Sequence, residues 1–235
     1  MDVSVRGVIV PTEDKWIYDW FMMDATSPAD IEKALKEANG EDVTLIINSG
    51  GGDVFAGNEI NYLISQYRGK TTADIVGIAA SIATVIACGA DTVRATAGAQ
   101  YMIHNVSGGA RGDYHTMDKT SEILRTANKT ISNTYRLKTG MSEKALLELM
   151  DQETWMDAVE AKKKGFIDEI IGDDGTLSRP KSLYNAGCFV NIIPDEVKEK
   201  IRNMVNNPNG EQVEADSDFL MKEKAKIEIL RMRGM

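Results

Sequence analysis

The sequence predicts one α/β domain followed by a charged tail. Short apolar runs of the kind found in buried parallel strands alternate with stretches whose apolar residues recur at helical spacing. With 235 residues and 43% hydrophobic residues, the chain can bury one main core. We expect the core domain at residues 1–172 and a linker with a helical tail at 173–235, because the composition changes to that of a linker after Gly172.

Strands and helices alternate through the first half of the chain. Gly and Pro residues mark several of their ends. The expected elements are a strand at Val3–Val10, a helix from Ser27-Pro28 to Gly40, a strand at Val43–Ile47, a Gly-rich turn at Asn48–Gly52, a helix at Val54–Tyr67, a strand at Thr72–Ile78 and a helix from Ser81 to Cys88.

The second half is richer in helix. Apolar residues at helical spacing predict one long amphipathic helix from Asp113 to Lys138. Its other expected elements are strands at Val93–Thr96 and Gln100–His104, a helix from Ser142 through Met150, a capping box at Asp157–Glu160, a strand at Phe166–Ile171, and tail helices at Pro194–Val205 and Asp218–Arg233.

Composition excludes several function classes. A formal net charge of −9 argues against nucleic acid or an anionic membrane as partner, since both are polyanions. The sequence has no apolar run near twenty residues, and its N-terminus lacks the features of a signal peptide. We therefore expect a cytoplasmic protein.

The metal-binding residue types are scarce. Cys88 and Cys188 form neither a metal pattern nor a disulfide framework, and His104 and His115 are the two histidines of the sequence. A catalytic zinc site is not expected, and neither is a cofactor. The Gly-rich turn lacks the lysine of a phosphate loop and the spacing of a dinucleotide fingerprint, which disfavours nucleotide binding.

Ser81 is the candidate nucleophile. It lies where a β-prone run ends and an Ala-rich helical run begins, beside the N–H groups and positive end of a helix. Both features stabilise negative charge on an attacked carbonyl oxygen. A small residue at such a junction can also simply allow close packing of helix and sheet.

A serine hydroxyl needs a base, and His104 is the better placed histidine. It closes an apolar strand at the end where α/β sheets present functional side chains, whereas His115 begins the long polar helix. The turn Gly50–Gly52 can expose backbone N–H groups to an oxyanion, or it can be an ordinary tight turn.

Together these segments resemble the Clp-type serine peptidases over residues 3–171. The matching segments are Asn48-Ser-Gly-Gly-Gly52, Ala79-Ala-Ser81, Met102-Ile-His104 and the block from Glu153 to Asp168. The resemblance implies a Clp/crotonase-like fold of repeated ββα units.

The resemblance also implies roles for single residues. Ser81 and His104 would be nucleophile and base, and the backbone N–H groups of Gly52 and Ile82 would form the oxyanion hole. Glu153 matches the position of the third triad member, where processive Clp peptidases carry an aspartate. Asp151 and Asp157 are alternatives for that role, since each is a nearby carboxylate.

The chain begins close to its first strand, and it carries the Glu-Thr-Trp segment and a charged C-terminal extension. In these features it looks most like the Clp-related head maturation peptidases of tailed bacteriophages. The resemblance implies ATP-independent cleavage of scaffold and capsid polypeptides, within a procapsid in the host cytoplasm. It also implies a homo-oligomeric ring, which can stack on a second ring, and we expect the helix from Asp113 to Lys138 to form the ring contacts.

Three other readings stay open. A processive Clp-type peptidase would depend on an ATP-driven unfoldase. A crotonase-like acyl-CoA enzyme shares the fold and would use the Gly-rich turn to polarise a thioester. A silent capsid-assembly protein would keep the triad without using it.

Overall fold

The computed structural model describes residues 1–173, 193, 197–199 and 201. Within them one sheet contains the strands β1 (Asp2–Ile9), β2 (Ala25–Thr26), β3 (Val43–Gly52), β4 (Thr71–Ala80), β5 (Thr92–Thr96), β6 (Gln100–Ile103), β7 (Thr154–Asp157) and β8 (Glu169–Ile171). Their spatial order is β2-β1-β3-β4-β5-β8, and β6 pairs with both β4 and β7. Every pairing is parallel except that of β6 with β7.

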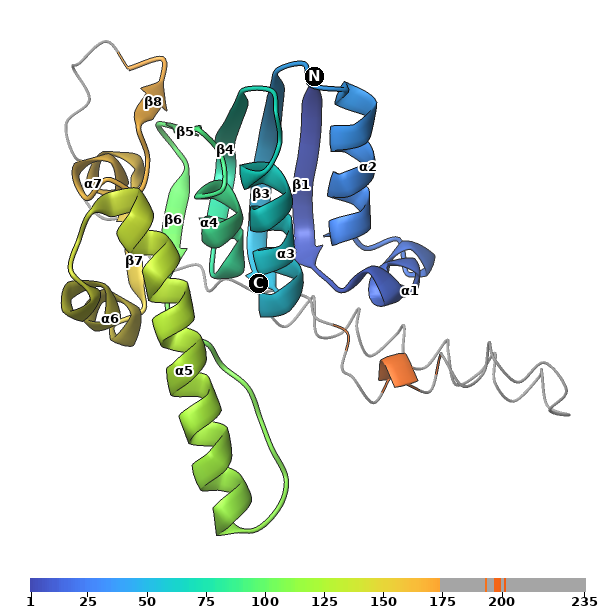
Figure 1. Cartoon of the computed structure of the whole chain (residues 1–235), viewed down its shortest axis with the longest axis vertical. Coiled ribbons are helices and arrows are strands. Elements are labelled where there is room, and N and C mark those ends of the chain that lie inside the picture. Colours follow the sequence, from blue (N-terminus) through green and yellow to red (C-terminus); the bar gives the residue numbers. More distant parts are fainter. Residues whose placement is uncertain (174–192, 194–196, 200, 202–235) are drawn as a thin grey trace, which may run out of the picture.

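The helices of these residues are η1 (Thr12–Asp14), α1 (Lys15–Trp20), α2 (Pro28–Ala38), α3 (Val54–Ser65), α4 (Ile82–Ala87), α5 (Tyr114–Thr139), α6 (Glu143–Asp151) and α7 (Ala158–Lys163). Figure 1 shows α2, α3 and α4 running along strands β1, β3 and β4. The main core lies between these layers, and its largest buried side chains include Leu45, Ile60 and Ile75. The predicted α/β fold is confirmed.

Local sequence explains where the helices begin and end. Ser27 caps α2 in a reciprocal capping box with Asp30, and Asn39 ends that helix in the left-handed conformation. Asp113 caps α5, and Gly140 ends it at a φ of 71°. These boundaries fall close to those expected from the sequence.

The Gly-rich segment was predicted as a turn, and this was wrong. Residues 48–52 continue β3, because β1 runs alongside and pairs Ile9 with Gly52. The β3–β4 register shifts between Ile47 and Ser49, and the Asn48 side chain compensates by accepting a hydrogen bond from the backbone N–H of Ile78 at 3.2 Å. The glycines therefore form an extended strand end rather than a reversal of the chain.

Two further regions differ from the expected elements. Residues 11–26, where no element was expected, contain η1, α1 and β2, whose short lengths give no clear periodicity. Strand β7 was not expected, and it pairs antiparallel with β6. Within residues 166–171, the strand is limited to β8.

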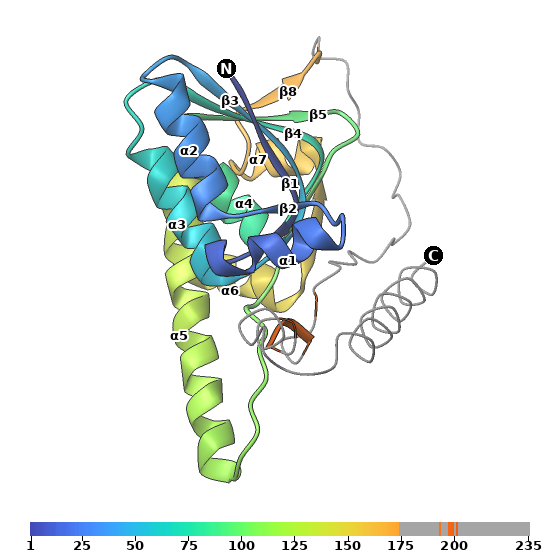
Figure 2. The ribbon, with the colours of Figure 1, turned by 90° about the vertical axis from the view of Figure 1, so that its right-hand side faces the viewer.

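Helix α5 extends well beyond the body of the domain in both views (Figures 1 and 2). Its buried residues are Ile131, Ser132 and Tyr135, all in its second half, whereas Tyr114 and Met117 of the first half are exposed. The projecting half is available for contacts outside this chain. No helix among the described residues is long and apolar enough to cross a bilayer.

A second, smaller core joins residues from the tail to the region around α1. Ile193, Val197 and Ile201 pack there with apolar residues of β1 and α1, including Tyr18. Lys198 lies beside them, and its Nζ donates to Asp14 Oδ2 at 3.2 Å, with both side chains largely buried.

The expected helix at 194–205 is helical at the residues that are described, 197–199 and 201. The expected linker after Asp173 and the helix at 218–233 lie outside the described residues. The expected boundary at residue 172 stays a prediction.

Replacing Lys198 by Ala should destabilise the protein, because Asp14 would lose a buried cationic partner. Loss of one member of a buried ion pair costs about 3 kcal/mol or more. Denaturant unfolding of the full chain measures this change. Lys144→Ala is the matched control, since Lys144 is 87% exposed and its ion pair with Glu148 should contribute less than about 0.5 kcal/mol. Equal effects of the two substitutions would contradict the role of the second core.

Candidate active site

Ser81 lies between the end of β4 and the start of α4, as expected. Its backbone adopts a φ of 55° and a ψ of −131°, which is unusual for a residue with a side chain. The backbone N–H of Ser81 donates to the carbonyl of Met102 at 2.9 Å, and the Ser81 carbonyl accepts from the N–H and the hydroxyl of Thr84. This backbone conformation is therefore held from both sides.

The glycines of β3 approach Ser81 closely. A Cβ atom added to Gly51 would lie 2.7 Å from the Ser81 Cβ, and Gly51 has a φ of 102°. A Cβ on Gly52 would lie 2.1 Å from the carbonyl oxygen of Ile9. Side chains at either position would displace the strand end, so the Gly-rich segment is required by close packing.

His104 reaches Ser81 because their strands are neighbours. Strand β6 pairs with β4 so that Met102 faces Ala80, and His104 follows at the end of β6. The His104 Nε2 lies 2.8 Å from the Ser81 Oγ, within hydrogen-bond distance. The structure brings together the two residues that the sequence singled out.

The environment of His104 keeps the imidazole neutral. Burial lowers the pKa of His104 below its usual 6.5, and the negative charge of Glu153 partly opposes this by raising the pKa. A neutral imidazole can accept a proton from a hydroxyl at neutral pH, which is what a general base requires.

Glu153 lies in the turn between α6 and β7. The last pair of the β6–β7 ladder is Ile103 with Thr154, and His104 and Glu153 are the residues that come directly beyond it on the two segments. Glu153 is exposed, has a φ of 48°, and accepts a hydrogen bond from the Trp155 indole at 3.3 Å. Glu153 acts on His104 through its negative charge.

The two alternative carboxylates have other partners. Asp151 accepts a hydrogen bond from the Asn105 side chain at 2.7 Å. Asp157 caps α7 by accepting from the backbone N–H of Glu160 at 2.7 Å. Among these three carboxylates, Glu153 is the one whose charge affects the pKa of His104.

A cavity of about 190 Å³ opens beside Ser81 and His104. Gly52 and Ile82, the expected oxyanion-hole residues, both line it. The remaining walls are mainly apolar, and they include Val54, Val85, Met102, Val106, Ile131 and Tyr135. The cavity is therefore suited to hold an apolar side chain next to the Ser81 hydroxyl.

Sequence reasoning did not place Ile131 and Tyr135 in this cavity. Both belong to the apolar stripe of α5 that was expected to form ring contacts, and their spacing of four residues was the available signal. Tyr135 also contacts the Ser81 region through its hydroxyl, which lies 2.6 Å from the Thr84 hydroxyl.

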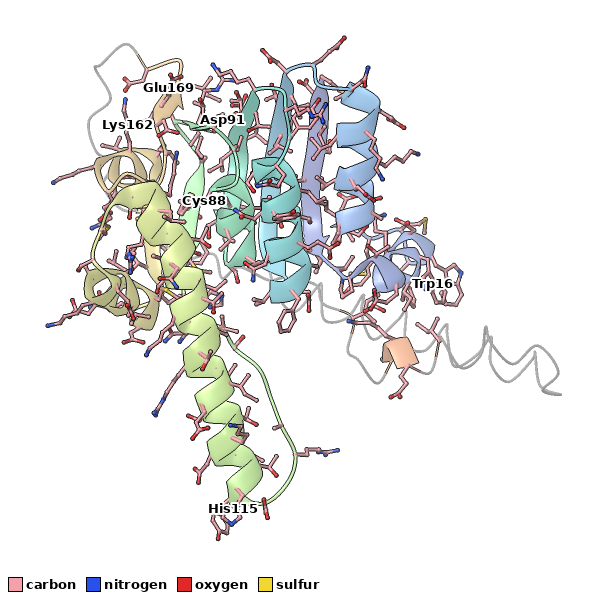
Figure 3. All side chains as sticks on the ribbon, viewed as in Figure 1. Trp16, Cys88, Asp91, His115, Lys162 and Glu169 are labelled. Carbon is pink, nitrogen blue, oxygen red and sulfur yellow. The ribbon has the colours of Figure 1, made fainter. Side chains whose placement is uncertain are left out.

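Other candidate groups lie outside this cavity. Figure 3 shows His115 at the far end of α5 and Cys88 inside the body of the domain. Burial raises the pKa of the Cys88 thiol to about 11, so this thiol stays protonated at neutral pH. Within the described part of the chain, no group of three His, Cys, Asp or Glu side chains could hold a metal ion. Cys188 lies outside the described residues.

Known proteins are similar to this chain in sequence and in fold. The Clp protease family model matches residues 31–174. An ATP-dependent Clp protease proteolytic subunit 1 from Chlamydia abortus is 35% identical over 137 residues, which covers 56% of this chain and 71% of that protein. A Streptococcus mutans ATP-dependent Clp protease proteolytic subunit is also 35% identical over 137 residues, covering 57% and 70%.

Among solved structures, a mutant of ClpP1 from Listeria monocytogenes superimposes with a TM-score of 0.61 at 22% identity. The match covers 74% of this chain and 92% of that one, and it confirms the Clp-like fold. The family match and the two relatives show that the chain belongs to the Clp protease family of serine peptidases.

Proposed function

We propose that Ser81 is the nucleophile and His104 the general base of a peptide-hydrolysing site. The observation that carries this proposal is the distance of 2.8 Å between Ser81 Oγ and His104 Nε2, beside a cavity lined by glycine backbone. As the Oγ attacks a peptide carbonyl carbon, its proton passes to His104 Nε2 and the carbonyl oxygen becomes an oxyanion. Backbone N–H groups of Gly52 and Ile82 would stabilise that charge.

The remaining steps use water and need no side chain beyond Ser81 and His104. Collapse of the tetrahedral intermediate breaks the C–N bond, and the leaving amine takes the proton from His104. An ester to Ser81 remains. His104 then accepts a proton from water, the resulting hydroxide attacks the ester carbon, and the Ser81 oxygen leaves with the proton from His104.

Glu153 would support His104 as the third member of the site. Its charge raises the pKa of His104 and so stabilises the imidazolium that forms during attack. The positions of the two residues, directly beyond the last pair of the β6–β7 ladder, support this role. Asp151 and Asp157 are less favoured, since they accept hydrogen bonds from Asn105 and from the start of α7.

The substrates would be polypeptides, as for the related proteolytic subunits. The relatives are named ATP-dependent, which favours a processive peptidase that receives its substrates from an ATP-driven unfoldase. We also propose that this chain forms a homo-oligomeric ring through the exposed half of α5. A crotonase-like activity is disfavoured, because such chemistry does not require the Ser81–His104 pair.

Head maturation is the second candidate. It rests on the segment Glu153-Thr-Trp155 and on the charged tail, of which Ile193, Val197 and Ile201 pack on the α1 region. In this reading the enzyme cuts scaffold and capsid polypeptides without ATP. The named relatives support the first candidate better than this one.

Ser81→Ala should abolish hydrolysis of a fluorogenic peptide that has leucine before the scissile bond. The substitution removes the attacking oxygen and leaves the surrounding backbone contacts in place. Initial rates measure the activity of the variant. Circular dichroism and the oligomeric state of the same sample show whether the variant is folded and assembled. A folded variant that retains hydrolysis would contradict the proposed nucleophile, and a variant that unfolds would indicate that Ser81 serves packing.

Glu153→Gln should lower kcat by up to about 10⁴-fold, the loss typical when a triad carboxylate is neutralised. It should also move the acidic limb of the kcat/KM profile to lower pH. His104 must be neutral to accept a proton, and loss of the Glu153 charge lowers the pKa of His104 further. Asp157→Asn is the matched control, which should affect stability more than turnover. A loss of kcat below tenfold, with no shift of the acidic limb, would show that Glu153 is not the third member of the site.

The products distinguish the two physiological roles. A peptidase fed by an unfoldase should degrade a stably folded protein to short peptides when a Clp-type unfoldase and ATP are both present. A maturation peptidase should cut scaffold or coat protein at a few sites without ATP. Mass spectrometry of the products after each incubation decides between them. Full activity on scaffold protein without ATP, and none with the unfoldase, would reject the processive reading.

A further inference from the structure

The backbone pairing that aligns His104 with Glu153 ends one residue before them. The last pair of the β6–β7 ladder is Ile103 with Thr154. Strand β6 ends there, and the chain continues toward α5 outside any strand. Something other than the ladder must therefore keep His104 and Glu153 at a fixed separation.

Side-chain hydrogen bonds take over directly after the ladder. Asn105, the residue after His104, donates through Nδ2 to the Oδ1 of Asp151 at 2.7 Å. Asp151 is the last residue of α6 and lies two positions before Glu153. One side chain thus connects the segment that carries His104 with the segment that carries Glu153.

Helix α5 supports this bridge from a third side. Asn128 donates through Nδ2 to the Oδ1 of Asn105 at 2.9 Å, and its own Oδ1 accepts from the backbone N–H of Val106 at 2.7 Å. Both ends of the Asn105 amide are therefore occupied. An amide suits this place because it can donate to a carboxylate and accept from a second amide simultaneously.

We propose that Asn105 is a positioning residue that holds His104 against Glu153 through its bridge to Asp151. This inference rests on the proposed function of Ser81, His104 and Glu153. In this arrangement the two neighbouring carboxylates have separate tasks. The charge of Glu153 acts on His104, and Asp151 fixes the segment that carries His104.

Asn105→Ala removes the bridge without altering the cavity walls. It should lower kcat by about tenfold to a hundredfold, the range expected when a reacting group is displaced by up to an ångström, with little change in KM. The acidic limb of the kcat/KM profile should move to lower pH, because Glu153 would raise the pKa of a displaced His104 less strongly. Rates of the full chain on the fluorogenic leucine peptide are normalised to the sites that a fluorophosphonate labels.

Asn133→Ala is the matched control on α5, at an exposed position, and it should leave kcat and the pH profile unchanged. Asn128→Ala should reproduce the effect of Asn105→Ala in part, since it removes the support but keeps the bridge to Asp151.

An exchange of partners tests the bridge itself. Asn105→Asp should place two carboxylates against each other and lower kcat at pH values above the pKa of His104. Adding Asp151→Asn restores one donor facing one acceptor, and it should recover most of the lost kcat. Recovery in the double variant is not expected if position 105 matters only for folding.

The outcomes separate this inference from the function on which it rests. If Ser81→Ala is inactive while Asn105→Ala keeps the wild-type kcat and pH limb, the positioning role is wrong and the proposed function stands. The same conclusion follows if Asn105→Ala loses kcat with no shift of the limb and the exchange fails to restore it. If Ser81→Ala remains active, the proposed function is wrong, and the inference falls with it.

Discussion

The positive φ of the Ser81 backbone is the constraint on which the rest of the site depends. A non-glycine residue in such a conformation costs about 1–3 kcal/mol, and it persists where its surroundings determine it. Here the N–H of Ser81 is held by Met102 and its carbonyl by Thr84, while Gly51 leaves room for its side chain.

This one conformation imposes requirements on three other elements. Strand β6 must lie against the end of β4, β3 must end in glycines, and α4 must begin directly after Ser81. The same strand pairing brings His104 to within 2.8 Å of the Ser81 Oγ. The contacts that hold the Ser81 backbone therefore also place His104 beside the Ser81 hydroxyl.

The antiparallel pair β6–β7 fixes the acidic side of the site. The three carboxylates between residues 151 and 157 have the same chemistry, yet their partners differ. Asp151 contacts Asn105, the charge of Glu153 raises the pKa of His104, and Asp157 caps a helix. The surroundings of each carboxylate follow from its position relative to the β6–β7 ladder. The resemblance pointed to Glu153, but the reason for that choice became visible only in the register.

Much of the fold could be predicted because it follows from local patterns. Apolar runs and helix caps gave most strands and helices, and the junction before Ser81 pointed to a nucleophile. The predictions that failed concern segments whose structure depends on strands distant in the sequence. The glycines at 50–52 read locally as a turn, but pairing with β1 makes them a strand, and β7 exists because β6 lies beside it.

The walls of the cavity were missed for the same reason. The spacing of Ile131 and Tyr135 shows that they share a helix face, without showing what that face contacts. The bridge through Asn105 joins three separate segments, so no local pattern reveals it.

The proposed chemistry requires that His104 activates Ser81 by accepting the proton of its hydroxyl. The most direct test is to incubate the purified full chain with a fluorophosphonate probe, then to measure its intact mass and map the labelled peptide. We expect one label per chain, on Ser81, and a labelling rate that falls by orders of magnitude in His104→Ala. Labelling at another residue, or equal labelling of Ser81 with and without His104, would contradict this chemistry.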